Sequence, residues 1–157
     1  MNQEDMIQLF QAHRDAEARR DYDAILDTFA DDCFLETIPL GLRSEGREAT
    51  RAAYTAYFTA FPDLAPEDQG MAVGDDVVVV WGFLRGTSLG EWLGLPPSGR
   101  PFSVRFANVV PFKNGKMAGE ASITTSLLSA RKLGFPSTRS DLRRRRDLLP
   151  PSSASSG

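Results

Sequence analysis

Two side chains of this sequence could act as an acid or a base near neutral pH. His13 is the only histidine, and imidazole is the side chain whose ordinary pKa lies closest to neutrality. It lies on the apolar stripe of a predicted helix over residues 3–20, where it could face a cavity. Glu36 lies within a predicted strand, where burial favours a protonated carboxyl that can take part in proton transfer. We therefore predict His13 and Glu36 as the candidate catalytic residues.

Each of the two has a structural alternative. A histidine on an apolar helix face often only satisfies hydrogen bonds inside the core. Glu36 and Thr37 point to opposite faces of their strand, so only one of them can face a cavity. If Glu36 faces outward, we expect it to pair with an arginine.

Two further polar side chains could orient the oxygens of a ligand. Asn108 and Thr125 lie on the otherwise apolar faces of a hairpin whose turn is Asn-Gly, a strong hairpin signal. Strict alternation places Thr125 on the same face as Ala121 and Ile123. Because buried polar atoms need partners, both side chains are predicted to line a pocket, with a purely structural pair as the alternative.

Arginine and aromatic side chains complete the predicted binding site. Arg85 shares a strand face with Trp81 and, near a cavity mouth, could bind a carboxylate or an enolate, unless it is only a solvated strand end. Trp92 lies in a segment rich in Gly and Pro, where a large aromatic either covers a ligand or joins a dimer. Tyr54 and Phe58 lie on one side of a predicted helix, as core or as ligand wall.

The elements that must position these side chains follow from periodicity. Helical spacing comes first along the chain, and extended alternation dominates after it, an order that predicts an α+β fold. The predicted helices cover residues 3–20, 21–29 and 47–61, and the predicted strands cover residues 33–38, 71–73, 77–85 and the hairpin 103–125. Helices packed on one face of a curved sheet leave a pocket between the two layers, the usual place for a ligand.

Length and composition limit the function classes. A chain of 157 residues with 41% hydrophobic and 25% charged residues suits one soluble domain. The net charge is −3, and the body is more acidic still because residues 135–157 carry five Arg against two Asp, so no nucleic-acid partner is expected. The single cysteine, Cys33, and the absence of a long apolar run predict a cytoplasmic protein without membrane contact.

Several short strings, taken in order, give the chain a resemblance to a known family. They are Tyr22-Asp23-Ala24-Ile25-Leu26, Phe29-Ala30-Asp31-Asp32, Gly46-Arg47-Glu48-Ala49, Phe61-Pro62-Asp63-Leu64, Gly74-Asp75-Asp76-Val77, Gly86-Thr87-Ser88-Leu89-Gly90-Glu91, Asn114-Gly115-Lys116-Met117 and Leu133-Gly134. Together they resemble the SnoaL-like polyketide cyclases of the nuclear transport factor 2-like superfamily. The resemblance implies a cone-shaped α+β barrel over residues 1–134, followed by an Arg/Pro/Ser-rich tail at 135–157 that we expect to be disordered.

The resemblance also implies chemistry. Relatives of this kind need no metal or organic cofactor, are frequently homodimers, and use a pocket Asp near the end of the last strand as acid or base in an intramolecular aldol closure. Alignment on the hairpin places Thr125 at that position, while Asn108 and Trp81 stand where relatives often carry ionisable or polar groups. Neither a Thr hydroxyl nor an Asn amide exchanges a proton reversibly near pH 7.

The resulting expectation is a cofactor-independent enzyme that binds a hydrophobic, oxygenated, polyketide-type small molecule. It would catalyse cyclisation, isomerisation, hydration or epoxide opening. The alternative is a non-catalytic binding or accessory protein of the same fold.

Overall fold

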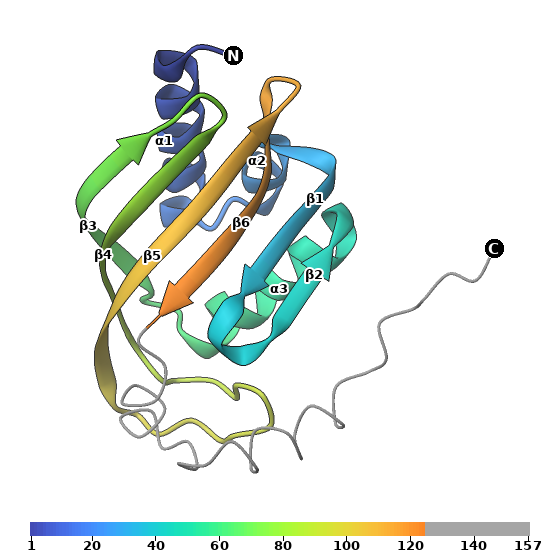
Figure 1. Ribbon diagram of the computed structural model, residues 1–157. Helices are drawn as coiled ribbons and strands as arrows, with labels where there is room; N and C mark the ends of the chain where they lie inside the picture. The colour runs from blue at the N-terminus through green and yellow to red at the C-terminus, as the bar shows by residue number, and fades with distance from the viewer. Residues whose placement is uncertain (125–157) are drawn as a thin grey trace.

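The computed structural model describes residues 1–124, which form three helices packed on one face of a six-stranded sheet (Figure 1). The α+β prediction is therefore confirmed. Thr125 and the predicted tail lie outside the described residues. The elements in chain order are α1 (Gln3–Arg19), α2 (Tyr22–Asp27), β1 (Phe29–Thr37), the short 3-10 helix η1 (Ile38–Leu40), β2 (Leu42–Glu45), α3 (Gly46–Ala60), β3 (Ala65–Val73), β4 (Val77–Thr87), β5 (Pro101–Lys113) and β6 (Lys116–Thr124).

The sheet is mixed and open. Its strand order is β2-β1-β6-β5-β4-β3, in which β1 and β6 run parallel and every other neighbouring pair is antiparallel. The strands at the two edges, β2 and β3, do not pair with each other, so the mostly antiparallel sheet stays open. Among the predicted strands, the largest difference is in β3, which begins at Ala65, whereas the sequence predicted a start at Met71.

Local sequence explains where the first two helices begin. The Asn2 side chain accepts a hydrogen bond from the backbone N–H of Asp5 at 2.8 Å, which caps α1. Asp21 does the same for Ala24 at the start of α2. Between the two helices Arg20 takes the left-handed conformation, with φ 58°, and ends α1. The apolar face of α1 thereby turns toward the sheet.

The core lies between the helices and the inner face of the sheet. Along β5 the even-numbered positions are buried and the odd-numbered ones are more open, so Asn108 shares the inner face with Phe106 and Val110, as predicted. Along β4 the same alternation buries Val80 and leaves Trp81 41% exposed on the outer face. None of the described helices has the length and apolar character needed to cross a membrane.

The β5–β6 hairpin contains a bulge that changes which residues of β6 face inward. Near the Asn-Gly turn, Phe112 pairs with Met117, and both are buried. Further on, Val109 pairs with Ala121, which leaves one more residue on β6 than on β5 between the two pairs. An extra residue shifts the pleat by one position. Beyond the bulge, the inward positions of β6 are therefore Glu120, Ser122 and Thr124, the opposite of strict alternation.

Candidate functional site

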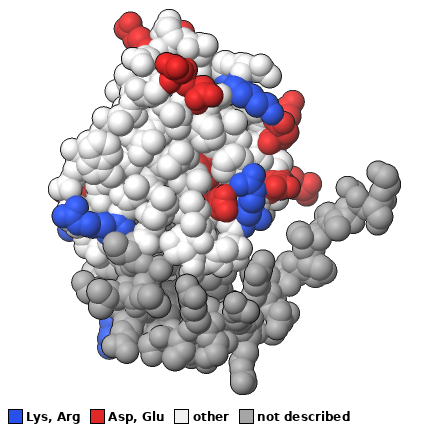
Figure 2. Space-filling view, in the orientation of Figure 1, with Lys and Arg blue, Asp and Glu red and all other residues white. Residues whose placement is uncertain are grey.

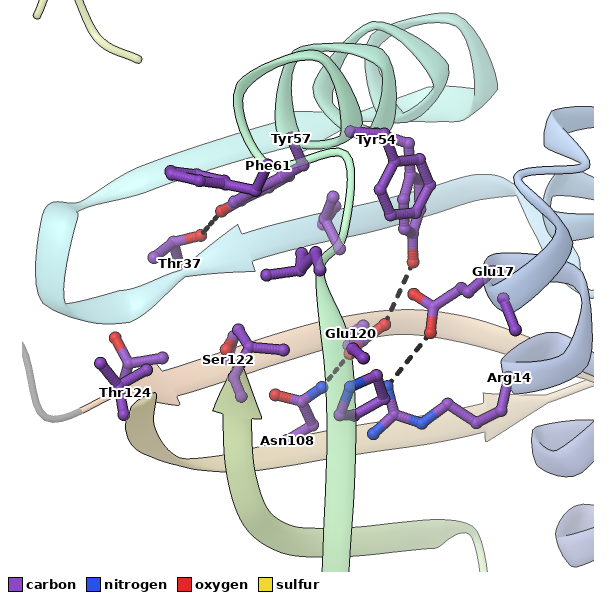
Figure 3. A pocket seen from close by; sticks show the side chains of 18 of the residues that line it. Arg14, Glu17, Thr37, Tyr54, Tyr57, Phe61, Asn108, Glu120, Ser122 and Thr124 are labelled. Carbon is purple, nitrogen blue, oxygen red and sulfur yellow. Dashed lines mark hydrogen bonds and ion pairs between the residues drawn. The ribbon is translucent and has the colours of Figure 1, made fainter. Parts of the chain in front are cut away.

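A cavity of about 590 Å³ lies between the inner face of the sheet and the helices α1 and α3. That volume is in the usual range for small-molecule sites. Most of its surface is apolar, and polar side chains reach it both from the strands and from the helices α1 and α3, as Figure 3 shows. The cavity is therefore built to hold a largely hydrophobic ligand with a small number of oriented polar atoms.

Glu120 is the buried carboxylate at the centre of this polar group. It is 6% exposed, and it lines the cavity from β6. Its Oε2 accepts a hydrogen bond from the Tyr54 hydroxyl of α3 at 3.2 Å, and its Oε1 accepts one from the side-chain amide of Asn108 on β5. Three separate elements thus fix the position of one carboxylate (Figure 3).

His13 lies directly behind Tyr54 and Glu120, fully buried. The Thr28 hydroxyl donates to the carbonyl of Ile25 at 2.6 Å, so its oxygen accepts from His13 Nδ1–H at 2.8 Å. Because Tyr54 donates its only hydrogen to Glu120, its oxygen accepts from His13 Nε2–H at 3.1 Å. The hydrogen-bond network therefore assigns a hydrogen to both ring nitrogens, and His13 is an imidazolium cation.

Two carboxylates balance this charge. His13 Nε2 lies 3.5 Å from Glu17 Oε1 and 3.6 Å from Glu120 Oε2. Burial by itself lowers the pKa of His13, but the charge of Glu17 and the hydrogen bonds to Glu120 and Glu17 outweigh it and raise that pKa to about 9. For Glu17, burial raises the pKa, yet the charge and hydrogen bonding of His13, helped by Arg14, lower it to about 2.

Arg14 supplies a second cation to the cluster formed by His13, Glu17 and Glu120. Its Nη1 donates to Glu17 Oε2 at 3.1 Å, and its Nη2 donates to Asp68 Oδ1 of β3 at 3.2 Å. Its guanidinium also lies 5.0 Å from the centre of the Phe10 ring. Arg14 therefore links Glu17 to Asp68, which lines the cavity.

Tyr54 is held in its neutral, hydrogen-donating form. Burial raises its pKa well above the ordinary value, and the negative charges of Glu120 and Glu17 add to the effect. At neutral pH the hydroxyl consequently keeps its hydrogen and can donate it to Glu120.

Among the described residues, one group has the composition of a metal site. His13, Glu17 and Glu120 each bring a ligand atom within 4.8 Å of the other two. A metal ligand must be a neutral imidazole, whereas both nitrogens of His13 carry hydrogens here. In addition, Arg14 already occupies the second oxygen of Glu17. The group is arranged as a set of ion pairs and does not fit a cation.

The opposite wall of the cavity is aromatic. Trp92 packs at a tilt against Tyr57, with ring centres 4.5 Å apart, and against Phe61, with ring centres 5.5 Å apart. The segment that carries Trp92 is attached to the end of α3, because the backbone N–H groups of Leu89 and Gly90 both donate to Ala60 O at 3.0 Å. The tryptophan therefore forms a fixed part of the wall.

The two predicted catalytic residues lie in different places relative to the cavity. His13 is within the cluster but does not line the cavity, because Tyr54, Glu17 and Glu120 stand between. Glu36 lies at the edge of the cavity with its carboxylate on Arg43 of β2 at 2.8 Å, the ion pair expected for an outward orientation. Its neighbour Thr37 takes the inward position and hydrogen-bonds to the Tyr57 hydroxyl.

Some of the predicted binding residues line the cavity and others do not. Those that line the cavity are Tyr54, Phe58, Trp92 and Asn108. Trp81 and Arg85 do not line it, because the odd-numbered positions of β4 face outward. Arg85 pairs instead with Glu67 of β3 at 2.7 Å. Thr125 lies outside the described residues.

Sequence reasoning missed Glu120, Ser122 and Thr124, which line the cavity. The cause is the bulge in β6, which reverses the alternation counted from the Asn-Gly turn. It also missed Glu17, although a charged residue interrupting the apolar face of α1 was a usable signal, since such a charge must find a partner.

Helices on one face of a curved mixed sheet, with a cavity between the layers, define a nuclear transport factor 2-like protein. Within that class, the family model of the SnoaL-like polyketide cyclases matches residues 7–131, and the chain belongs to that family.

Solved structures agree on the fold. A candidate SnoaL-like polyketide cyclase from Jannaschia sp. CCS1 is 22% identical, with a TM-score of 0.77 over 85% of this chain and 94% of that one. TsrD from Streptomyces laurentii is 23% identical, with a TM-score of 0.73 over 85% of this chain and 98% of that one. IdmH, a candidate polyketide cyclase from Streptomyces antibioticus, is 21% identical, with a TM-score of 0.67 over 81% and 96%. A search of curated proteins gives no match.

Proposed function

We propose that the protein is an enzyme that closes a ring in a hydrophobic, oxygenated, polyketide-type molecule, with Glu120 as its acid and base. The observation that carries the proposal is the position of Glu120, a carboxylate 6% exposed that lines a largely apolar cavity and is held at both oxygens. Glu17 also lines the cavity, but a pKa of about 2 makes it a weak base. Glu36 is engaged with Arg43 at the edge.

The reaction needs only groups that the chain and the substrate supply. Glu120 takes a proton from a carbon next to a carbonyl, and the electron pair of the C–H bond forms an enolate. The enolate carbon attacks a second carbonyl carbon of the same molecule, so a C–C bond forms while the C=O π bond breaks. The resulting alkoxide then takes the proton back from the Glu120 carboxyl.

The residues around Glu120 have supporting roles in this proposal. Tyr54 and Asn108 orient its carboxylate, and they do not need to exchange protons. His13 is a positioning residue, because its charge acts through Glu17, Glu120 and Tyr54 and it does not reach the cavity. The cavity adds to the rate by holding a flexible chain in a reactive conformation.

One observation favours the alternative, a non-catalytic ligand-binding protein. Both oxygens of Glu120 already accept hydrogen bonds within the protein, as expected for a carboxylate that only holds the core together.

Kinetics of Glu120→Gln decide between the two functions. With a diketone that can cyclise, we expect Glu120→Gln to lower kcat by about 100-fold or more while the ligand still binds, since amides do not exchange protons near neutrality. Glu36→Gln is the matched control and should change kcat less than about threefold, because its charge pairs at the surface. Saturable binding without turnover in wild type would support the binding protein, and equal loss in both variants would refute the role of Glu120.

A further inference from the structure

Two side-chain hydroxyls, those of Thr37 and Tyr57, share one hydrogen bond, and both residues line the cavity. Thr37 ends β1 and Tyr57 reaches it from α3, as Figure 3 shows. Each hydroxyl carries one hydrogen, and the bond between them uses only one of the two. Neither hydroxyl has another hydrogen-bond partner among residues 1–124, so one hydrogen of the Thr37–Tyr57 pair has no acceptor there.

This second hydrogen stays on the pair at neutral pH. Burial raises the pKa of Tyr57, the hydrogen bond with Thr37 offsets part of that rise, and the negative charge of Glu120 adds to it. The phenol is therefore neutral and keeps its hydrogen. A buried hydroxyl hydrogen without an acceptor costs free energy, and because both side chains line the cavity, the expected acceptor is an atom of a ligand.

The pair belongs to the same cavity as Glu120. Thr37 is opposite Ser122 in the parallel pairing of β1 with β6, and Ser122 lies two positions beyond Glu120 on the inward face. The two sites have opposite chemistry, since an ionised carboxylate only accepts hydrogen bonds, whereas the hydroxyl pair always offers one donor. One ligand can therefore present a C–H bond to Glu120 and a carbonyl oxygen to the pair.

We propose that the Thr37–Tyr57 pair binds a carbonyl oxygen of the ligand through this hydrogen. In the ring closure of the proposed function, on which this assignment rests, the oxygen belongs to the carbonyl carbon that the enolate attacks. As the C=O π bond breaks, negative charge develops on that oxygen and the hydrogen bond becomes stronger, which lowers the barrier. The pair keeps its hydrogen throughout, and the proton that the alkoxide takes up still comes from Glu120.

Either hydroxyl alone can supply the donor. Tyr57→Phe leaves the hydrogen of Thr37 without its partner, and Thr37→Val does the same for the hydrogen of Tyr57, so each single variant keeps one donor. Only the double variant has none. If the pair merely joins α3 to β1, the pattern is the opposite, because either single substitution already breaks the bond and the second adds nothing.

Binding of two probes of nearly equal shape to the full chain, measured by isothermal titration calorimetry, distinguishes these roles. One probe is 2-acetylnaphthalene, and the other is 2-isopropenylnaphthalene, in which a CH2 group replaces the carbonyl oxygen. We expect both single variants to bind the ketone within about twofold of wild type, and the double variant to bind it about fivefold or more weakly. The alkene should bind all four proteins within about twofold of one another, because it accepts no hydrogen bond.

The infrared carbonyl stretch of bound 2-acetylnaphthalene gives a second readout. A hydrogen bond to the oxygen weakens the C=O bond, so the frequency should be similarly low in wild type and in both single variants, and higher in the double variant. A higher frequency in either single variant, or a wild type that does not bind the ketone, would overturn the proposal. If the double variant also loses the alkene and has therefore lost its cavity, the frequencies in the two single variants decide.

Separate experiments test the carbonyl site and the catalytic role of Glu120. Turnover retained in Glu120→Gln would refute the catalytic role, and the ketone data on the Thr37–Tyr57 pair would still stand. Conversely, a ketone affinity that is unchanged in the double variant would refute the carbonyl site, and the kinetics of Glu120→Gln would keep their meaning.

Discussion

The charge of His13 links the candidate site to the stability of the protein. The imidazolium is fully buried and is stabilised by Glu17 and Glu120, which raises its pKa from 6.5 to about 9. A group whose pKa is higher in the folded state binds its proton more tightly there. Its contribution to stability is therefore complete below pH 6.5 and is lost as the pH rises through about 9.

His13→Gln tests this linkage. Removing one partner of a buried ion pair costs about 3–5 kcal/mol, so at pH 6 the variant should be less stable than wild type by roughly that amount. The difference should shrink as the pH approaches 10, because wild type then loses the charge that the variant never had. Urea unfolding of both proteins at several pH values measures it. A difference that stays constant from pH 6 to pH 10 would mean that His13 is neutral in the folded protein.

Glu17 makes the stability of the folded protein depend on pH in the acid range as well. Its pKa is lowered from 4.5 to about 2, so the stability it contributes is complete above pH 4.5 and is lost as the pH falls through about 2. The ion pair between His13 and Glu17 contributes to both dependences, while Glu120 adds to that of His13 and Arg14 adds to that of Glu17.

At the scale of elements, β6 shows how far the sequence could predict the site. The Asn114-Gly115 turn was predicted correctly, and both residues have positive φ, at 51° and 76°. The inward position of Asn108 was also predicted, because β5 alternates without interruption along the core. The catalytic candidate Glu120 was not, because one extra residue in β6 reverses the alternation. A bulge has no strong sequence signal, so counting from the turn gave the wrong face.

Gly119 makes room for this bulge. A Cβ at Gly119 would lie 2.4 Å from atoms of the Phe34 ring on the neighbouring strand β1. The Arg43 guanidinium also contacts this ring, 3.9 Å from its centre. The close approach of β6 to β1, which sets the position of Glu120, therefore depends on the missing side chain.

We expect Gly119→Ala to destabilise the protein by about 1–3 kcal/mol, the usual cost of overpacking. Adding Phe34→Ala should recover part of this loss, because it removes the atoms that the new methyl group meets. Chemical denaturation of both single variants and of the double variant measures the coupling. Strictly additive losses would show that the new methyl group does not interact with the Phe34 ring.

At the scale of the whole molecule, the topology assembles the site. Glu17 comes from α1, Tyr54 from α3, Asn108 from β5 and Glu120 from β6. Because β1 pairs in parallel with β6, the last strand lies inside the sheet, between β1 and β5. Glu120 on this strand then lies beneath the helices. Sequence spacing could not give these distances, because they depend on how strands far apart in the chain pair with one another.

The outer face of the sheet is the remaining large apolar surface of the described residues. Trp81 of β4 is 41% exposed and Ile123 of β6 is 45% exposed, and both belong to the face opposite the helices. Figure 2 views the molecule from this side, and few charged side chains lie over the middle of the sheet. Exposed apolar patches of this kind mark interaction surfaces. We propose that a second copy of the chain covers the face, so that the protein is a homodimer.

Trp81→Glu should convert the dimer to a monomer, because a second copy would bury the new charge without a partner. Sedimentation velocity measures the mass of wild type and variant at equal concentration. Leu89→Glu is the matched control: Leu89 is apolar and 54% exposed but lies in the segment after β4, so its substitution should leave the mass unchanged. A monomeric wild type would refute the dimer. A Trp81→Glu variant that stays dimeric would place the interface elsewhere, because a charge in the middle of a buried apolar contact is not tolerated.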